Sequence, residues 1–332
     1  MKPLYISRRT VLQTLAALGG TALLGNVSAQ SAWPTKPVKL VVPFNPGGAT
    51  DLIARTLAEA LSKRIGQPVI VENKGGAAGV LGTSAVTNAQ ADGYTFLLSL
   101  STSMLINQFL YTKLPYSPQK DLLMLSQIAG APVTLVVHPS IPANTMPELL
   151  AYAKANKGKL SYGSWGVGSY AHLAGAYMSK TTESDMVHVA YKGESPMIQD
   201  LIGGNIQVCF SSAINTRPFI ESGRVKVIGV TGTTRMEILP QVPTLHEQGV
   251  TDDAYSIFGW VALGAPAGLP QNIVDTLYGH LKEIIKEPQM LERIKGAGFI
   301  PMMNSPQDFQ RNYQRDMTIW KALVETADAK LD

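Results

Sequence analysis

Two glycine-rich turns, each between an apolar run and a helical pattern, are the segments of this sequence best suited to bind an anion. In the first, Gly47 and Gly48 follow an apolar run and precede Thr50 and Asp51. The first amide groups of a helix have no internal partner and the helix dipole is positive there, so an anion is a natural occupant. Because Thr50 or Asp51 could instead simply cap the helix, the segment leaves both interpretations open.

The second turn offers Ser164 and Ser169 as hydrogen-bond donors, with His172 one helical turn further on. Residues 166–171 formally match the G-x-G-x-x-A pattern of dinucleotide sites, but residues 187–192 contain no acid for a ribose. The match is therefore weak, and a second anion-friendly helix start remains. For His172 a structural role in the helix is favoured over direct ligand contact.

A third polar segment, residues 99–103, follows the predicted strand 94–98. It contains four hydroxyl side chains, among them Ser101 and Thr102. They could line a cleft, but capping of the following helix is the favoured interpretation.

Several kinds of catalytic site have no support in the sequence. There is neither a G-x-S-x-G elbow nor a G-x-x-x-x-G-K-[ST] loop, and the five His residues show no metal-binding spacing. The single Cys209, flanked by apolar residues in a predicted strand, is expected to be a buried small side chain. We therefore expect no enzyme activity, no metal and no cofactor.

The first 29 residues are predicted to be a signal peptide. Lys2, Arg8 and Arg9 precede an apolar segment over residues 11–27, and Ala29 ends a small-residue cleavage site. The pair Arg8-Arg9 resembles a twin-arginine signal. An uncleaved N-terminal anchor is the alternative, disfavoured because glycines interrupt the apolar segment.

Charge and composition describe a globular exported protein. Of 332 residues, 45% are hydrophobic and 16% charged, which is globular composition with room for two domains. Removing the leader leaves 332 − 29 = 303 residues, and it lowers 28 basic residues to 25 against 24 acidic ones, a net charge of +1. This balance gives no electrostatic basis for nucleic-acid binding. We expect a monomer in the periplasm.

Apolar β-branched runs alternate with helical patterns along the chain. Strands are predicted at residues 38–44, 68–72, 94–98, 133–138, 160–163, 187–190, 206–210, 225–230 and 256–263. Helices are predicted at residues 49–65, 147–156, 169–180 and 215–222. This order predicts an α/β fold, with mainly parallel sheets buried on both faces by helices.

Sequence signals also place the helix starts and the domain limits. Capping boxes are predicted at Thr145/Glu148 and at Ser305/Asp308. The second begins a helix whose apolar stripe is expected to pack in the core of the first lobe; the stripe is Phe309, Tyr313, Met317, Trp320 and Val324. Pro- and Gly-rich loops at residues 129–132 and 249–254 predict a discontinuous first lobe, 30–131 and 254–332, enclosing a second lobe, 132–253.

A series of motifs extends in order over almost the whole mature chain. They are Trp33-Pro34, Val41-Val42-Pro43-Phe44-x-Pro46-Gly47-Gly48-x-Thr50-Asp51, Val71-Glu72-Asn73-Lys74, Asp92-Gly93-Tyr94-Thr95, Leu114-Pro115-Tyr116, His172-Leu173-Ala174-Gly175, His188-Val189-x-Tyr191-Lys192-Gly193, Asp200-Leu201-Ile202-Gly203-Gly204 and Pro240-x-Val242-Pro243-Thr244. With these motifs the sequence resembles the periplasmic solute receptors of tripartite tricarboxylate transporters, the Bug-type (TctC) family. The resemblance implies a two-lobed periplasmic binding protein, type II-like, with two crossover connections. It also implies delivery of a small carboxylate to a permease with one large and one small membrane subunit.

The resemblance further implies that backbone amides, hydroxyls and bridging water hold the carboxylate between facing loops. Carried over by position, the expected ligand-binding residues are Phe44, Gly48, Ala49, Thr50, Asp51, Ser101, Thr102, Ser164, Gly168, Ser169, His172, Tyr191 and Ser211.

One departure from the family pattern bears on the ligand. Many relatives carry Asp after the Phe of the predicted strand 206–210, where this chain has Ser211-Ser212. If that position faces the ligand, the pocket lacks an acid to pair with an ammonium, so we expect a ligand without a free amine, such as a di- or tricarboxylate or an aromatic acid. Two other functions stay open at this point, a nucleotide-dependent periplasmic oxidoreductase and a sensor subunit that presents a ligand to a membrane kinase.

Overall fold

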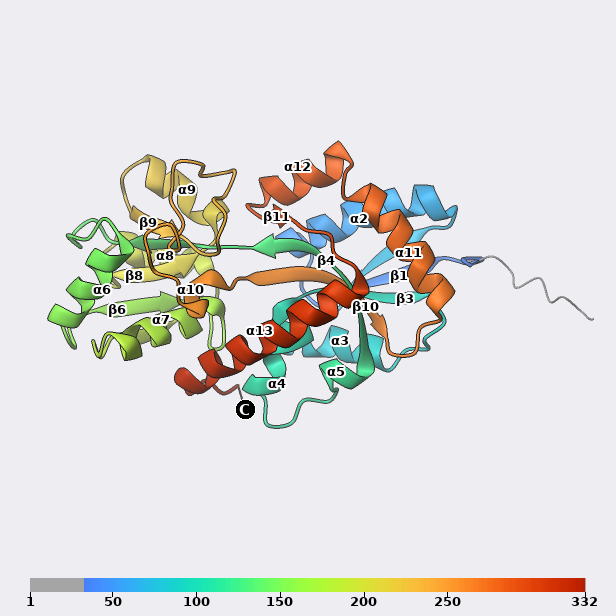
Figure 1. The fold of residues 1–332 in the computed structure, drawn as a ribbon, viewed down its shortest axis with the longest axis horizontal. Coiled ribbons are helices and arrows are strands. Elements are labelled where there is room, and N and C mark those ends of the chain that lie inside the picture. The colour runs from blue at the N-terminus through green and yellow to red at the C-terminus, as the bar shows by residue number, and fades with distance from the viewer. Residues whose placement is uncertain (1–32, 332) are drawn as a thin grey trace, which may run out of the picture.

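The computed structural model describes residues 33–331, which form two β-sheets flanked by helices (Figure 1). The strands are β1 (Val38–Val42), β2 (Val69–Asn73), β3 (Thr95–Leu100), β4 (Leu122–Ala131), β5 (Thr134–Val137), β6 (Ser161–Ser164), β7 (Val187–Ala190), β8 (Val208–Ser211), β9 (Lys226–Val230), β10 (Gly259–Pro266) and β11 (Ile300–Pro301). The helices are α2 (Ala49–Ile65), η1 (Ala77–Gly79), α3 (Val80–Thr87), η2 (Thr102–Ile106), α4 (Asn107–Leu110), α5 (Pro118–Asp121), α6 (Met146–Ala155), α7 (Tyr170–Thr181), α8 (Glu194–Ile202), α9 (Ala213–Glu221), α10 (Asp253–Ser256), α11 (Gln271–Ile284), α12 (Pro288–Gly296) and α13 (Pro306–Thr326). The predicted signal peptide lies outside the described residues.

The first sheet has the strand order β11-β4-β10-β3-β1-β2, and the second has the order β7-β6-β8-β5-β9. In the first, β1 pairs in parallel with β2 and β3, whereas β10 runs antiparallel to both of its neighbours. In the second, β6 pairs in parallel with β7 and β8, and β5 runs antiparallel to β8 and β9. Each sheet with its helices forms one lobe, so the predicted α/β class is confirmed. The expectation of mainly parallel sheets was wrong, because β4, β5, β10 and β11 pair antiparallel and make both sheets mixed.

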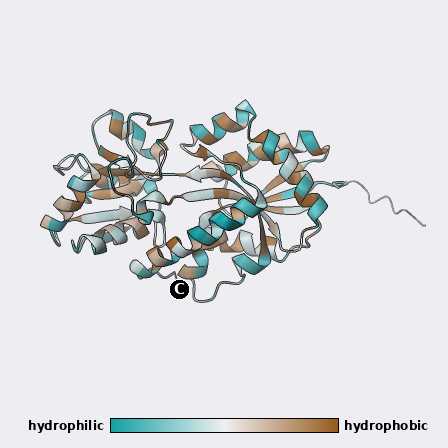
Figure 2. Cartoon of the chain, viewed as in Figure 1, coloured by the Kyte–Doolittle hydropathy of each residue, from teal (hydrophilic) through white to brown (hydrophobic). Residues whose placement is uncertain are grey.

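Both faces of the central strands are buried, as the continuous apolar runs predict, whereas the edge strands β2 and β7 are partly exposed. Along β3, Leu97 belongs to one hydrophobic cluster while Phe96 and Leu98 belong to another on the opposite face. Successive strand residues point to opposite faces, so a strand covered on both sides is apolar at most of its positions. In Figure 2 the strands run from pale to hydrophobic colours, and the helices alternate between hydrophilic and hydrophobic segments.

Strand β4 was missed by the sequence patterns. Its residues include few β-branched side chains, and Ser126 and Gln127 interrupt the apolar run. Both are buried, and Asn304 satisfies them: its Oδ1 accepts from the Gln127 amide at 2.8 Å, and its carbonyl accepts from the Ser126 hydroxyl at 2.9 Å. The predicted loop at residues 129–132 is wrong over its first part, because residues 129–131 complete this strand.

The chain passes between the lobes at Pro132, after β4, and again in the long segment between β9 and β10. The two crossings meet at Val133 and Thr231. The Thr231 amide donates to the Val133 carbonyl at 2.9 Å, and the Val133 amide donates to the Thr231 hydroxyl at 2.9 Å. These bonds hold the two connecting segments side by side.

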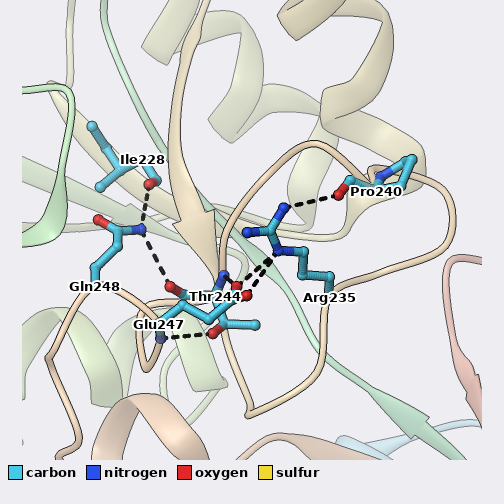
Figure 3. Close-up of polar contacts among 6 residues, drawn as sticks. All are labelled: Ile228, Arg235, Pro240, Thr244, Glu247 and Gln248. Carbon is cyan, nitrogen blue, oxygen red and sulfur yellow. Dashed lines mark hydrogen bonds and ion pairs between the residues drawn. The ribbon is translucent and has the colours of Figure 1, made fainter.

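The loop after β9 is fixed to the second lobe by a hydrogen-bonded network (Figure 3). Glu247 Oε2 accepts from Arg235 Nε at 2.9 Å and from the Thr244 amide at 2.7 Å. Gln248 Nε2 donates to the Ile228 carbonyl at 2.9 Å, which ties the loop to β9. The second crossing is therefore an ordered part of the second lobe.

Helix α13 lies against both lobes rather than only in the core of the first (Figure 1). It packs on β4 of the first lobe and on α7 of the second. Trp320 makes an edge-on contact with Tyr170 of α7, with ring centroids 5.9 Å apart. The expectation that its apolar stripe is core was right, but the stripe is shared between the lobes. Sequence periodicity shows that a face is buried and does not show what buries it.

Helix starts follow the predicted caps. At α6 the Thr145 hydroxyl and the Glu148 carboxylate form the reciprocal capping box. At α13 the Ser305 hydroxyl accepts from the Asp308 amide at 3.0 Å. Within the part of the chain that the structure covers, no helix has both the length and the hydrophobicity to cross a membrane.

Candidate functional site: the cleft between the lobes

A cavity of about 670 Å³ lies between the two lobes. The first lobe contributes the start of α2, the turn from β3 into η2, and α12; the second contributes the turn before α7, the start of α8 and the start of α9. Gly47 and Ser169 both line it, so the two glycine-rich turns open onto one shared space.

The first turn leaves its helix start available to a ligand. Gly48 precedes α2 without any side-chain cap, and Ala49 and Thr50 line the cavity. Gly47 has φ +90°, a conformation that strains any residue with a Cβ. A carboxylate in the cavity would therefore meet uncapped amides at the positive end of a helix.

Asp51, expected among the ligand residues, instead stabilises this turn from its buried side. Its side chain is 3% exposed, and Oδ2 accepts from the Gly47 amide at 2.9 Å and from Arg55 Nε at 3.0 Å. Asn73 Nδ2 donates to Oδ1 at 2.9 Å. Burial raises the pKa of Asp51, but these hydrogen bonds outweigh it and lower the pKa below its ordinary value.

The hydroxyls at the end of β3 and directly after it divide between two roles. Ser101 and Thr102 line the cavity at the start of η2, which is a short π-helix. Ser99 and Ser103 turn away from it, with their hydroxyl oxygens 2.6 Å apart inside the first lobe. π-helical turns widen the backbone locally and recur at functional sites.

The second turn uses most of its polar groups internally. The Gly168 amide donates to His172 Nδ1 at 3.1 Å, and the Ser164 hydroxyl lies 2.8 Å from His188 Nε2. The two imidazoles stack with centroids 4.0 Å apart. Burial, with the neighbouring His188, lowers the pKa of His172 to about 4, and burial also lowers the pKa of His188. Both rings are therefore neutral at pH 7.

Of the expected ligand residues, Ala49, Thr50, Ser101, Thr102 and Ser169 line the cavity. The remaining eight do not line it, and most have partners inside their own lobe. Tyr191 donates to Asp200 at 2.7 Å, and burial, together with this bond, raises the pKa of Tyr191. Phe44 packs on the first-lobe core, and Ser211 is fully buried on β8.

An acid does line the cavity, which the sequence analysis missed. Glu194, the first residue of α8, reaches Ser212, and Ser212 Oγ donates to its Oε2 at 2.5 Å. The expectation of a pocket without an acid was therefore wrong: the carboxylate comes from a different helix, beside Ser211-Ser212. The signal available in the sequence was an acid at the start of a helix that follows the motif Tyr191-Lys192-Gly193.

Apolar side chains from both lobes form the rest of the wall. They include Leu52, Leu100, Trp165, Ile214 and Phe299. Leu52 and Ile214 are 37% and 50% exposed, although both are large and hydrophobic. Such exposure at facing helix starts is typical of a site that buries these side chains when it binds.

The protein-family model "Tripartite tricarboxylate transporter family receptor" matches residues 53–328. The chain belongs to this family. It is 32% identical to Protein BugT of Bordetella pertussis over 96% of this chain and 98% of BugT. Among solved structures it is similar to Rpa4515 of R. palustris with adipate, at 33% identity and a TM-score of 0.75, covering 90% of this chain and all of that one. MatC of Rhodopseudomonas palustris with bound malate is 26% identical with a TM-score of 0.71, covering 88% of this chain and all of MatC.

Membership in the tripartite tricarboxylate transporter receptor family decides against the enzyme among the functional classes left open by the sequence. The family is one of periplasmic solute receptors and not of enzymes, so the oxidoreductase interpretation of residues 166–171 is set aside. The two-lobed binding-protein fold is likewise shared with its solved relatives.

Proposed function

We propose that this receptor captures a small organic acid in the cleft between its lobes, with the carboxylate on the uncapped start of α2. The observation that carries the proposal is the single cavity lined by Gly47, Ala49 and Thr50 on one side and by Ser169 on the other. The adipate and malate bound by two relatives agree with a carboxylate ligand. Apolar walls then bury the body of the ligand.

The energetics are sufficient without covalent chemistry. A micromolar ligand requires about 8 kcal/mol of binding free energy. Four or five charge-assisted contacts of ~1.5–3 kcal/mol each supply this after the costs of ordering and lobe closure.

Several finer features belong to the same proposal. We propose lobe limits of 30–131 with 254–332 and 132–253, export through the twin-arginine leader, and a monomer in the periplasm. The partners would be one large and one small membrane subunit of a tripartite permease. Of the expected ligand residues that do not line the cavity, six would act behind its wall by shaping the two turns: Phe44, Gly48, Asp51, Ser164, Gly168 and His172. Tyr191 and Ser211 would act through their hydrogen bonds to Asp200 and Glu194.

Calorimetric titration of the exported protein with adipate, malate, citrate, benzoate and the amino acids 4-aminobutanoate and leucine tests the proposal. We expect one ligand per chain, with an affinity near micromolar for at least one of these acids. The fluorescence of Trp165 and Trp320, which line the cavity, should change on binding. No binding to any organic acid, with a flavin or nicotinamide co-purifying instead, would overturn it.

A further inference from the structure

Glu194 occupies a cluster of hydrogen-bond donors on the second-lobe wall of the cavity. Its Oε2 accepts from Ser211 Oγ at 2.9 Å, from Ser212 Oγ at 2.5 Å and from Asn215 Nδ2 at 2.6 Å. The Ser212 amide, at the start of α9, donates to both carboxylate oxygens at 3.3 Å. Two hydroxyls, an amide side chain and a helix start form a good anion site, and the protein's own carboxylate fills it.

The hydrogen bonds fix the Glu194 side chain and leave one oxygen under-used. Oε2 takes three side-chain donors, whereas Oε1 has only the longer contact with the Ser212 amide. A carboxylate can accept about four hydrogen bonds, so Oε1 retains capacity for a donor on a ligand. All of these partners are uncharged, so none of them neutralises the carboxylate.

The other charged side chains at the cavity do not neutralise Glu194. Glu292 and Arg293 of α12 also line it, but both side chains are exposed and offset each other in charge. Asp51, the acid nearest the α2 start, does not line the cavity. The first-lobe wall therefore favours an anion, while the second-lobe wall favours a hydrogen-bond donor or a cation.

We propose that Glu194 makes this receptor select zwitterions, with the ligand's carboxylate at the α2 start and its protonated amine at Glu194. This inference rests on the proposed function and names the ligand class of that same site. A second carboxylate is rejected because it would face Glu194 and would find its donors already used. Apolar side chains between the two ends, such as Leu52 and Ile214, contact the ligand's hydrocarbon part.

Matched ligands that differ only at the end away from the carboxylate test the inference. Calorimetry with the exported wild-type protein would compare 6-aminohexanoate, hexanoate and adipate, and 4-aminobutanoate, butanoate and succinate. Leucine, with its amine next to the carboxylate, tests a short separation between the two groups, and 4-methylpentanoate is its amine-free partner. We expect the best amino acid to bind roughly 10- to 100-fold more tightly than its amine-free partner, and the diacids to bind most weakly.

Glu194→Gln and the control Glu292→Gln separate the two positions. Both remove one carboxylate from the same cavity, but only the first removes the one held by Ser211, Ser212 and Asn215. Glu194→Gln should weaken the best amino acid roughly 10- to 100-fold, change its amine-free partner about twofold or less, and strengthen the diacid. Glu292→Gln should change each affinity about twofold or less, because its side chain is exposed.

Two outcomes would contradict the inference, and they differ from failure of the proposed function. Wild-type protein that binds adipate or succinate more tightly than the matching amino acid overturns the zwitterion while leaving the carboxylate receptor intact. An amino-acid affinity that Glu194→Gln leaves unchanged, with thermal unfolding as in the wild type, shows that the ammonium is held elsewhere. A wild-type protein that binds none of these acids removes the proposed function and the inference together.

Discussion

The two lobes present similar glycine-rich turns to one cavity, but they use the backbone donors of those turns differently. In the first lobe Gly48 enters α2 without a cap, so the first amides of the helix face the cavity. In the second lobe Ser169 caps α7, and the Gly168 amide is taken by His172. A strand-turn-helix junction is therefore an anion site only when the protein itself leaves the donors unfilled.

The same contrast holds for the acids near the two turns. Asp51 lies behind the first turn, where it holds the Gly47 amide and leaves the cavity wall uncharged. Glu194 lies on the cavity wall of the second lobe and uses the donors at the start of α9. The two walls of the cavity thus favour ligand groups of opposite charge, although the two turns look alike in sequence.

The largest expected effect comes from deleting one first-lobe donor. Ala49→Pro removes the first amide of α2 while keeping the helix, because proline suits the first helical position. Gly48 already has φ −77° and ψ 168°, which a following proline accepts. Carboxylate affinity should fall roughly 10- to 100-fold by calorimetry. The control Gln271→Pro, at the start of α11 away from the cavity, should leave affinity unchanged; equal losses in both variants would argue against the α2 site.

Acid should weaken the second lobe through its stacked histidines. The pKa of His172 is lowered to about 4 in the folded protein from 6.5, so the unfolded chain binds the proton more readily. The contribution of the neutral His172 ring to the free energy of unfolding is therefore present above about pH 6.5 and is lost as the pH falls toward 4. At pH 5 this loss should be between about 1 and 2 kcal/mol. Urea unfolding at pH 7.5 and pH 5 measures this loss. His172→Asn should reduce the pH dependence, whereas His246→Asn, at an exposed loop, should not; a His172 ring that titrates near 6.5 by NMR would disprove the cause.

A smaller effect is expected from the second-lobe cap. Ser169→Ala removes the hydroxyl that accepts from the His172 amide, which should cost about 1 kcal/mol of stability. Thr145→Ala, at the cap of α6, should cost a similar amount without touching the cavity. Thermal unfolding and ligand titration of both variants would show whether Ser169 acts as a cap or as a ligand donor. A loss of ligand affinity above about tenfold in Ser169→Ala alone would show that the second turn also binds the ligand, as the first is proposed to do.

The smallest effect is expected where the lobes touch at the surface. Lys295 of α12 lies 2.8 Å from Glu237 in the loop after β9, and their side chains are 38% and 69% exposed. Because exposed ion pairs are screened by water, Glu237→Gln should change stability by about 0.5 kcal/mol or less. It should also leave ligand affinity within about twofold, as calorimetry would show. A loss of more than about 2 kcal/mol would mean that this contact latches the lobes.

Most of the strands and both helix caps could be predicted locally. The observed α2 has the predicted bounds, and β7 does too, because glycines and β-branched runs mark their ends. β4 could not be predicted in this way. Its Ser126 and Gln127 are tolerated only because Asn304, far away in sequence, completes their hydrogen bonds.

The sequence by itself determined the family, the α/β class and the two turns, because these depend on local composition and on motifs in a fixed order. Only the tertiary structure decided which donors remain available. Hydrogen bonds such as Gly168 to His172 and Ser212 to Glu194 join residues whose approach depends on how helices seat on a sheet. A donor's availability is a property of every group within about 3 Å of it, and spacing along the chain does not encode that distance.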